Sequence, residues 1–204
     1  RSGLFWTCLS ALKTLRASNP ELRYVMENVT FQFRKERRFQ RDFQQVCRHL
    51  GAPLTFCASR VSPAARRRNY WTNLASGVPE PRTDRDWCTV LDPHHRVPKA
   101  RSTNEFNQRG RPARKAPTVM ASADTYSVRD GSALVFNVNT RKWELPYIHE
   151  LEKMVGLQPG ATAAPGVSEA ARRRACGNIL DGNVFTHLLQ SISSTRTKSA
   201  STAH

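Results

Sequence analysis

Residues 22–61 read LRYVMENVTFQFRKERRFQRDFQQVCRHLGAPLTFCASRV, and this stretch decides the fold class. It begins with a short apolar run at 22–26 that predicts a strand. Apolar residues then recur at helical spacing and predict a helix over 34–51, which a glycine ends. A second strand is predicted at 53–61, and an amphipathic helix at 3–17 precedes the whole stretch. This order of helix, strand, helix and strand predicts an α/β sheet with parallel pairing.

Beyond this stretch the sequence combines an irregular region with further short elements. Residues 75–116 are rich in Pro, Arg and Asp, show little periodicity, and are typical of a loop-rich lobe. The remaining patterns predict strands at 116–122 and 133–138, helices at 146–157, 167–178 and 182–192, and a disordered tail from residue 193 onward.

The composition points to a polyanionic partner. Lys and Arg total 32 against 16 acidic residues, so the formal net charge is +16. Most of these cations are Arg, whose guanidinium binds phosphates and base edges through two parallel hydrogen bonds. Nucleic acid is therefore the first partner to expect. A coding bias toward Arg is the alternative explanation of the excess.

The cysteines indicate a reduced, intracellular compartment. Five of them are scattered through the chain without a CxxC pair, which argues against a disulfide framework. Cys88 with His94 and His95 is the one local group of metal-ligating types, and it lacks a fourth ligand nearby. We therefore expect no metal, and no sequence pattern predicts a membrane span.

A polar pair directly follows the first predicted strand. Glu27 and Asn28 follow its apolar residues, and ligands of open α/β sheets bind beyond the carboxyl ends of strands. In an extended segment Arg66 and Arg68 would point the same way and Arg67 the other. Two guanidiniums near a carboxylate would bind a group that carries both donors and acceptors, such as a nucleobase. A helix cap, a solvated loop and a solvated basic patch are the alternatives.

Five stretches in order resemble motifs of the DNA (cytosine-5) methyltransferases. ENV at 27–29 and VSPAARRRNYWTNL at 61–74 resemble motifs VI and VIII, and the second is closest to the animal de novo type. KAPTVMAS resembles motif IX, LPYIHELEKMVGLQPG resembles a helix of the family, and ARRRACGNILDGNVFTHLL resembles motif X. The matches cover residues 22–190 and imply a partial Rossmann-like, S-adenosylmethionine-dependent methyltransferase fold.

The resemblance implies a role for each polar group. Such enzymes flip a cytosine out of duplex DNA, add a Cys thiolate to ring carbon 6, and methylate carbon 5. Glu27 would hold the amidine edge of the base, and Asn28 would orient the active-site backbone. Arg68 would contact the cytosine carbonyl oxygen, and Arg66 would support the nucleophile and the base. In motif X the residues that would line the pocket of S-adenosyl-L-methionine are Asn178, Ile179 and Leu180.

The resemblance also implies a division of the chain and a DNA surface. It divides the chain into part of the catalytic sheet (1–74), a target recognition region (75–145), helices returning to the catalytic domain (146–192) and a disordered tail (193–204). Segments 101–115 and 122–133 would meet double-stranded DNA, against the alternative of a mobile charged loop. The expected contacts are Arg109, Arg111, Arg114, Lys115 and Arg129.

The family's Gly-rich cofactor loop and its Pro-Cys nucleophile have no counterpart here. The sequence therefore predicts the C-terminal part of a nuclear methyltransferase, inactive alone. The helix before ENV favours the usual order, in which the missing motifs precede residue 1, and the alternative is the order of the plant domains-rearranged enzymes, in which they follow motif X. A catalytically dead homologue that binds DNA or stimulates a partner methyltransferase is the alternative, and a generic basic nucleic-acid-binding domain is a third. The oligomeric state, alone or with another methyltransferase subunit, stays open.

Overall fold

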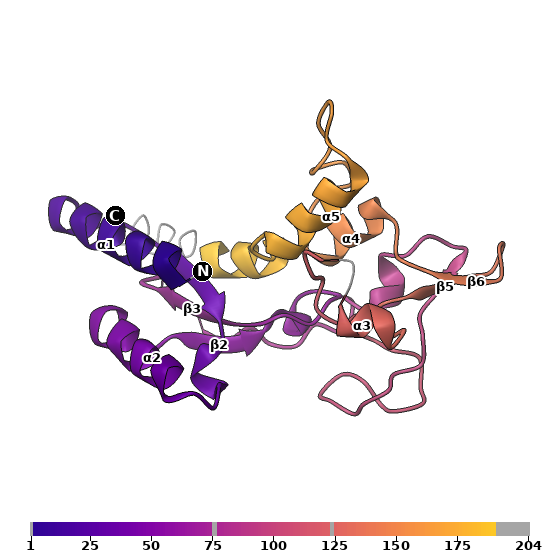
Figure 1. The fold of residues 1–204 in the computed structure, drawn as a ribbon, viewed down its shortest axis with the longest axis horizontal. Helices are drawn as coiled ribbons and strands as arrows, with labels where there is room; N and C mark the ends of the chain where they lie inside the picture. The colour runs from indigo at the N-terminus through magenta and orange to yellow at the C-terminus, as the bar shows by residue number, and fades with distance from the viewer. Residues whose placement is uncertain (1, 75–76, 123–124, 191–204) are drawn as a thin grey trace, which may run out of the picture.

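The computed structural model describes residues 2–74, 77–122 and 125–190, and the side chains from residue 4 onward. The predicted disordered tail and the last two residues of the predicted helix 182–192 lie outside these ranges. The elements, in chain order, are α1 (Ser2–Ser18), β1 (Val25–Val29), η1 (Phe31–Phe33), α2 (Arg37–Leu50), β2 (Leu54–Cys57), η2 (Ala58–Arg60), β3 (Arg67–Thr72), η3 (Trp87–Thr89), β4 (His95–Arg96), α3 (Tyr126–Arg129), β5 (Val135–Asn137), β6 (Lys142–Glu144), α4 (Ile148–Met154) and α5 (Glu169–Asn178), followed by a helix over 182–190. The mixed α/β fold class is confirmed (Figure 1).

The first sheet has the order β1-β3-β2. Both β1 and β2 pair with β3 in the antiparallel sense. The two outer strands therefore run in the same direction without touching, and the predicted parallel pairing is wrong. The helix-strand pattern gave the direction of β1 and β2 correctly, but it carried no information about the reversed strand that separates them.

Two predicted strands also need correction. The first strand spans Val25–Val29, three residues later than predicted, so Glu27 and Asn28 lie within it rather than beyond its end. The apolar run at 116–122 forms no strand; apart from an isolated bridge at Ala116, it is irregular backbone. The prediction at 133–138 is confirmed by β5, which pairs with β4 and β6 in a second sheet of order β4-β5-β6.

Helices cover both faces of the first sheet. On one face Trp71 is fully buried beneath aromatic side chains of α1 and α2, including Phe5 and Phe43. On the other face Tyr70 packs with Phe56 and with Val184 and Leu188 of the helix 182–190. Successive strand residues point to opposite faces, so the adjacent aromatics Tyr70 and Trp71 each fill a separate core.

The helix α2 shows how its sequence fixes its geometry. Val46 is fully buried, and Phe39, Phe43 and Leu50 pack in the same core at the predicted helical spacing. Gly51 ends the helix at a φ of 78°, and its N–H donates to the carbonyl of Cys47 over 2.9 Å. This backbone conformation strains residues that carry a Cβ, so the glycine is required there.

A third core joins the loop-rich lobe to the C-terminal helices. Trp87 and Val135 of the lobe pack with Leu151 and Met154 of α4 and with Cys176 of α5. Below these helices the second sheet extends to the end of the molecule opposite α1 and α2 (Figure 1). The carbonyl end of α5 points back toward the first sheet, where Arg66 lies.

Candidate active site on the first sheet

A carboxylate and two guanidiniums meet on one face of the first sheet. Glu27 pairs with Tyr70 across β1 and β3, and Arg68 lies two residues before Tyr70 on the same face. The Glu27 Oε1 atom lies 2.7 Å from Arg68 Nε and 4.0 Å from Arg66 Nε. The sequence-predicted convergence of these three residues is therefore present in the structure.

Period-two alternation explains why only two of three consecutive arginines take part. Arg67 is exposed, and its guanidinium lies over the ring of Phe33 at 4.9 Å on the opposite face. The side chain of Arg66 is 8% exposed and that of Arg68 is 16% exposed. The arrangement leaves Glu27 with 23% of its side chain exposed, although the Oε1 atom itself is buried.

The three charged groups are anchored differently. Arg66 Nη1 donates to the carbonyl of Gly177 over 3.0 Å, while Arg68 Nη1 donates to the carbonyl of Arg67 over 2.8 Å. Burial and the neighbouring guanidinium of Arg68 lower the pKa of Arg66, which Glu27 partly offsets. Removing Glu27 would leave two like charges close together in a poorly solvated site, so the carboxylate holds the pair in place.

Asn28 does not join this group. Neighbouring strand residues point to opposite faces, so Asn28 lies on the side of α1 and α2, in a small cavity with Phe5 and Trp6. Its Oδ1 accepts a hydrogen bond from the Val29 N–H over 2.8 Å. The structure therefore separates Asn28 from Glu27, although the two are adjacent in sequence.

A buried polar network ties the two predicted motif segments together behind the arginines. Ser62 Oγ donates to Asp181 Oδ1 over 2.6 Å, and Asn183 Nδ2 donates to Ser62 Oγ over 3.0 Å. The same carboxylate oxygen accepts the N–H groups of Asn183 and Val184 at the start of the helix 182–190. Burial raises the pKa of Asp181, and these hydrogen bonds oppose the rise.

Tyr70 and Asp181 are residues that sequence reasoning missed. Tyr70 is fully buried beside Glu27, and burial, with the carboxylates of Glu27 and Asp181, raises the pKa of its hydroxyl. Both residues lie inside stretches already singled out, RRRNYW and GNILDGN. Asp181 bonds to Ser62, more than 100 positions away in sequence, and Tyr70 pairs with Glu27 on another strand. No spacing within a short segment could therefore have identified either residue.

The predicted cofactor residues lie next to this site. Asn178 ends α5 and is exposed, and it directly follows Gly177, whose carbonyl holds Arg66. Ile179 continues in extended conformation and packs against the lobe core, whereas Leu180 packs against the core under Tyr70. These residues would fit one wall of a cofactor site, with the Asn178 amide and the adjoining backbone as its polar groups.

The predicted DNA contacts divide into exposed and internal residues. Arg109, Arg111 and Arg129 are exposed. Arg114 is also exposed but makes two hydrogen bonds to the carboxylate of Asp86, at 2.8 and 3.1 Å.

The prediction for Lys115 as an exposed phosphate contact is wrong. Lys115 is 2% exposed, and its ammonium donates to the carbonyls of Ser62 and Arg85 over 3.1 and 2.6 Å. Burial lowers the pKa of this amine. The side chain joins the lobe to the segment before β3, so its role in the structure is an internal one.

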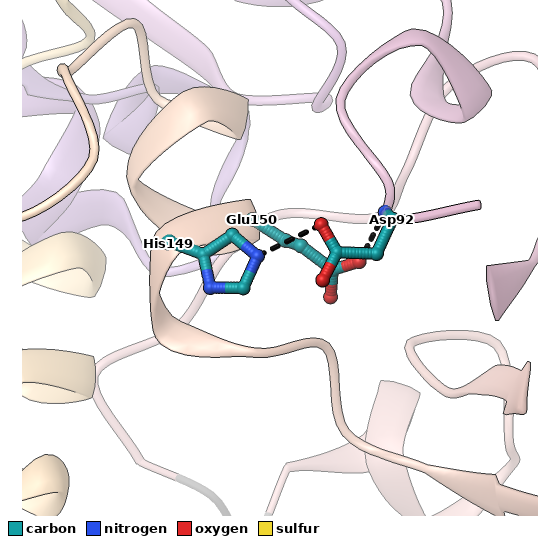
Figure 2. A group of neighbouring side chains, drawn as sticks. All are labelled: Asp92, His149 and Glu150. Atoms are coloured by element: carbon teal, nitrogen blue, oxygen red, sulfur yellow. Dashed lines mark hydrogen bonds and ion pairs between the residues drawn. The ribbon is translucent and has the colours of Figure 1, made fainter. Parts of the chain in front are cut away.

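A second cluster of titratable groups lies between the lobe and α4. Figure 2 shows Asp92, His149 and Glu150, which could each offer a ligand atom within 4.8 Å of the others. Both Glu150 oxygens are already occupied, since Oε1 accepts the Asp92 N–H over 2.7 Å and Oε2 accepts the Tyr147 N–H over 2.6 Å. His149 Nε2 lies 2.9 Å from Asp92 Oδ1. The group therefore serves to anchor the start of α4.

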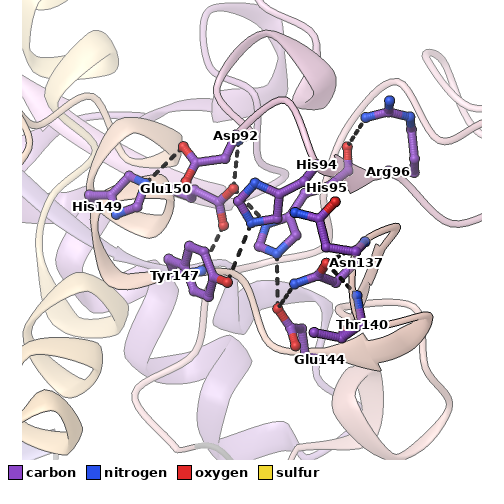
Figure 3. Close-up of polar contacts among 11 residues, drawn as sticks. Asp92, His94, His95, Arg96, Asn137, Thr140, Glu144, Tyr147, His149 and Glu150 are labelled. Atoms are coloured by element: carbon purple, nitrogen blue, oxygen red, sulfur yellow. Dashed lines mark hydrogen bonds and ion pairs between the residues drawn. The ribbon is translucent and has the colours of Figure 1, made fainter.

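His95 extends this network into the second sheet (Figure 3). Its fully buried ring lies between Glu150, 2.7 Å from Nδ1, and Glu144, 3.0 Å from Nε2. Burial alone would lower the pKa of His95, but the two carboxylates outweigh burial and raise it. The His95 ring therefore links α4 to the β5–β6 hairpin through both of its nitrogens.

Comparisons with known proteins give fold similarity alone. No protein-family model matches the chain, and no curated protein matches it. Among solved structures it is similar to the Entamoeba histolytica methyltransferase EhMeth, with a TM-score of 0.49 and 13% identity over 85% of this chain and 65% of that chain. The S. pombe Dnmt2 methyltransferase gives a TM-score of 0.48 and 14% identity over 84% and 67%. A mutant of Spodoptera frugiperda DNMT2 gives 0.46 and 16% over 83% and 66%.

These three neighbours are methyltransferases of low identity to this chain, which spans about two thirds of the length of each.

No helix among the described residues combines the length and apolarity needed to cross a membrane.

Proposed function

We propose that this chain is the target-base-binding part of a DNA (cytosine-5) methyltransferase of the animal de novo type. The enzyme would transfer a methyl group from S-adenosyl-L-methionine to carbon 5 of a flipped-out cytosine in double-stranded DNA. The observation that carries the proposal is the convergence of Glu27, Arg66 and Arg68 on one partly exposed sheet face. A domain that only binds the DNA backbone has no use for a carboxylate at that point.

The chemistry of the site suits a cytosine edge. A carboxylate accepts hydrogen bonds from the exocyclic amine and from a protonated ring nitrogen, and a guanidinium donates to the ring carbonyl. Glu27 Oε1 forms an ion pair with Arg68 Nε at 2.7 Å, and this buried oxygen has no hydrogen-bond partner among the residues that the structure describes. Glu27 would stabilise the protonated ring nitrogen as negative charge develops on the base, which is where a preorganised group lowers a barrier most.

The two arginines would act at different distances from the base. Arg68 lies closer to Glu27 and is the more exposed, so it would donate to the cytosine carbonyl oxygen. Arg66 is tied to Gly177 and would hold the base-binding face against the end of α5. It is a positioning residue in this proposal, because its guanidinium already has a partner.

The cofactor would approach from the end of α5. The exposed amide of Asn178 and the backbone through Leu180 would line its pocket, and S-adenosyl-L-methionine would supply the methyl group. The Cys nucleophile and the Gly-rich loop would come from residues outside the 204 of this chain. The division of the chain at residues 74, 145 and 192 and a nuclear location belong to the same proposal.

Double-stranded DNA would contact the lobe through its exposed arginines. Phosphates or base edges would be bound by Arg109, Arg111 and Arg129. Arg114 already donates a hydrogen bond to Asp86, so it would contact DNA only while it also binds that carboxylate. The basic composition supports this partner, since phosphate binding with counterion release scales with the number of cations engaged.

The test is methyl transfer by the full-length polypeptide that contains this chain. Purified enzyme, duplex DNA and S-adenosylmethionine labelled on its methyl group should give labelled 5-methylcytosine. DNA binding without label transfer would instead support a catalytically dead homologue. The label on RNA alone, or on another base, would overturn the proposed substrate.

A further inference from the structure

A basic groove with an aromatic wall lies at the far end of the molecule from the first sheet. It is bordered by the strands β5 and β6, by the segment that follows β4, and by residues at the end of α3; these elements are at the right of Figure 1. Its cationic side chains are Arg96, Lys99, Arg101, Arg109 and Arg129. Among the residues that the structure describes, one carboxylate lines the groove, that of Asp130, and it accepts the Ser132 N–H over 2.8 Å.

The charge of the groove is therefore strongly positive. Lys99, Arg101 and Arg109 are exposed, and the described residues provide no ion pair or hydrogen bond for Lys99 or Arg109. Burial alone would raise the pKa of Asp130, but the hydrogen bonds from Ser132, with a smaller contribution from the positive charge of Arg101, outweigh burial and lower it. Four positive charges in excess around one concave surface match a run of phosphates.

The aromatic wall distinguishes this groove from a plain phosphate-binding surface. Trp143 is 53% exposed, whereas Trp71 and Trp87 are 0% and 1% exposed. Phe136 faces Trp143 directly across the β5–β6 pair, with ring centroids 5.3 Å apart. Phe136 supports the indole from one side, and the exposed part of Trp143 borders the groove.

An exposed indole beside phosphate-binding cations suits a nucleobase whose faces are free. In a duplex both faces of each base are covered by its neighbours, so a side chain stacks only on an unpaired base. The groove is bordered by the second sheet, whereas Glu27 belongs to β1 of the first sheet, and the second sheet lies at the other end of the molecule from α1 and α2 (Figure 1), so this base would be a different one from the methylation target.

We infer that this groove binds an unpaired segment of a DNA strand, with phosphates on Lys99, Arg101 and Arg109 and one base stacked on Trp143. The choice of DNA over RNA rests on the proposed function, whereas the recognition of an unstacked base rests on the groove alone. Stacking on one aromatic side chain contributes about 5- to 150-fold in affinity.

The experiment measures binding of a fluorescent oligothymidylate of about 12 nucleotides by anisotropy, with the whole chain and without cofactor. The wild-type chain should bind the single strand more tightly than a duplex of equal length, and binding should quench indole fluorescence. Trp143→Ala should bind roughly 5- to 150-fold more weakly. Trp143→Phe should keep most of the affinity and lose the quenching.

Two matched controls lie outside the groove. Phe33→Ala removes another exposed aromatic ring, and Arg174→Ala removes another exposed arginine. Both should bind as wild type does, whereas Arg109→Ala should reduce the slope of log affinity against log salt by about 0.7. Thermal melts of each variant show whether the fold is kept.

Several results would overturn the inference. It would be wrong if Trp143→Ala bound the oligothymidylate as tightly as the wild type, or if the wild type bound the duplex equally well. It would also be wrong if oligouridylate bound more tightly, or if an equal concentration of oligoglutamate displaced the DNA. None of these outcomes bears on Glu27, because the assay involves no methyl transfer. Equally, an inactive parent enzyme would leave the binding data intact.

Discussion

Glu152 is a fully buried carboxylate that joins three segments, and its replacement by Gln should destabilise the chain in a pH-dependent way. The side chain is 0% exposed. It accepts hydrogen bonds from the Gly160 N–H, from the N–H and hydroxyl of Thr162, and from the Arg172 guanidinium at 3.0 Å. The contacts fix α4 to α5, whose carbonyl end positions Arg66.

The magnitude follows from the titration of this group. Burial alone would raise the pKa of Glu152, but the hydrogen bonds from Thr162, Gly160 and Arg172 outweigh burial and hold it at about 2, against an ordinary value of 4.5. The difference corresponds to about 3 kcal/mol of folding free energy at neutral pH. Because the folded-state pKa is the lower one, this stabilisation is present above pH 4.5 and is lost as the pH falls toward 2.

The assay is thermal and urea unfolding of the wild-type chain and Glu152→Gln, followed by circular dichroism at pH 7 and pH 4. We expect the variant to lose about 3 kcal/mol at pH 7, or roughly 6–12 °C in melting temperature. The difference between the two proteins should shrink by about 1 kcal/mol at pH 4. Glu169→Gln removes an exposed helical ion pair with Arg173 and should cost at most about 0.5 kcal/mol.

Two outcomes would refute this reasoning. If Glu152→Gln unfolds at the wild-type free energy at pH 7, the hydrogen bonds to the carboxylate do not stabilise the fold. If the variant is destabilised equally at pH 7 and pH 4, the loss comes from packing rather than from the charge of Glu152.

Three further predictions concern the residues around the two sites. Gly177→Ala should destabilise the chain by roughly 1–3 kcal/mol, because a Cβ there would lie 2.1 Å from a backbone nitrogen, whereas Gly77→Ala, with nothing within 4 Å, should melt as wild type does. Lys115→Met should change the melting temperature without changing the salt slope of duplex binding, whereas Arg109→Ala should lower that slope by about 0.9 at unchanged stability. His95 should contribute fully to the free energy of unfolding below pH 6.5, and this contribution should decline as the pH rises above 6.5, because the pKa of His95 is raised in the folded state. His95→Gln should abolish this decline in unfolding measurements. The first prediction would be contradicted if Gly177→Ala kept the wild-type melting temperature, and the second if Lys115→Met lowered the salt slope of duplex binding. The third would be contradicted if the pH dependence of unfolding survived in His95→Gln.

Local periodicity explains what the sequence could predict. The buried face of α2 and the alternation of Arg66, Arg67 and Arg68 follow from repeats of 3.6 and 2 residues, which are properties of short segments. The same rule separates Glu27 from Asn28, once both are known to lie inside β1 rather than after it. The bounds of the first strand were predicted three residues too early. A run of apolar residues indicates which residues are buried, whereas the bounds of a strand depend on its backbone hydrogen bonds.

Contacts between distant segments explain what the sequence could not predict. The position of β3 between β1 and β2 depends on pairing partners that no single segment specifies. Lys115 is one more cation in a basic stretch until the carbonyls of Ser62 and Arg85 enclose its ammonium. The exposed Trp143 belongs to a strand of three residues, too short for any periodic signal.

The account depends most on Glu27, and one measurement tests that residue directly. In the full-length polypeptide that contains this chain, the rate of methyl transfer to duplex DNA should fall about 10- to 1000-fold in Glu27→Gln. Glu21→Gln, which removes an exposed carboxylate from the segment before β1, should keep the wild-type rate. A wild-type rate in Glu27→Gln, with DNA binding unchanged, would contradict the assignment of this sheet face to the target cytosine.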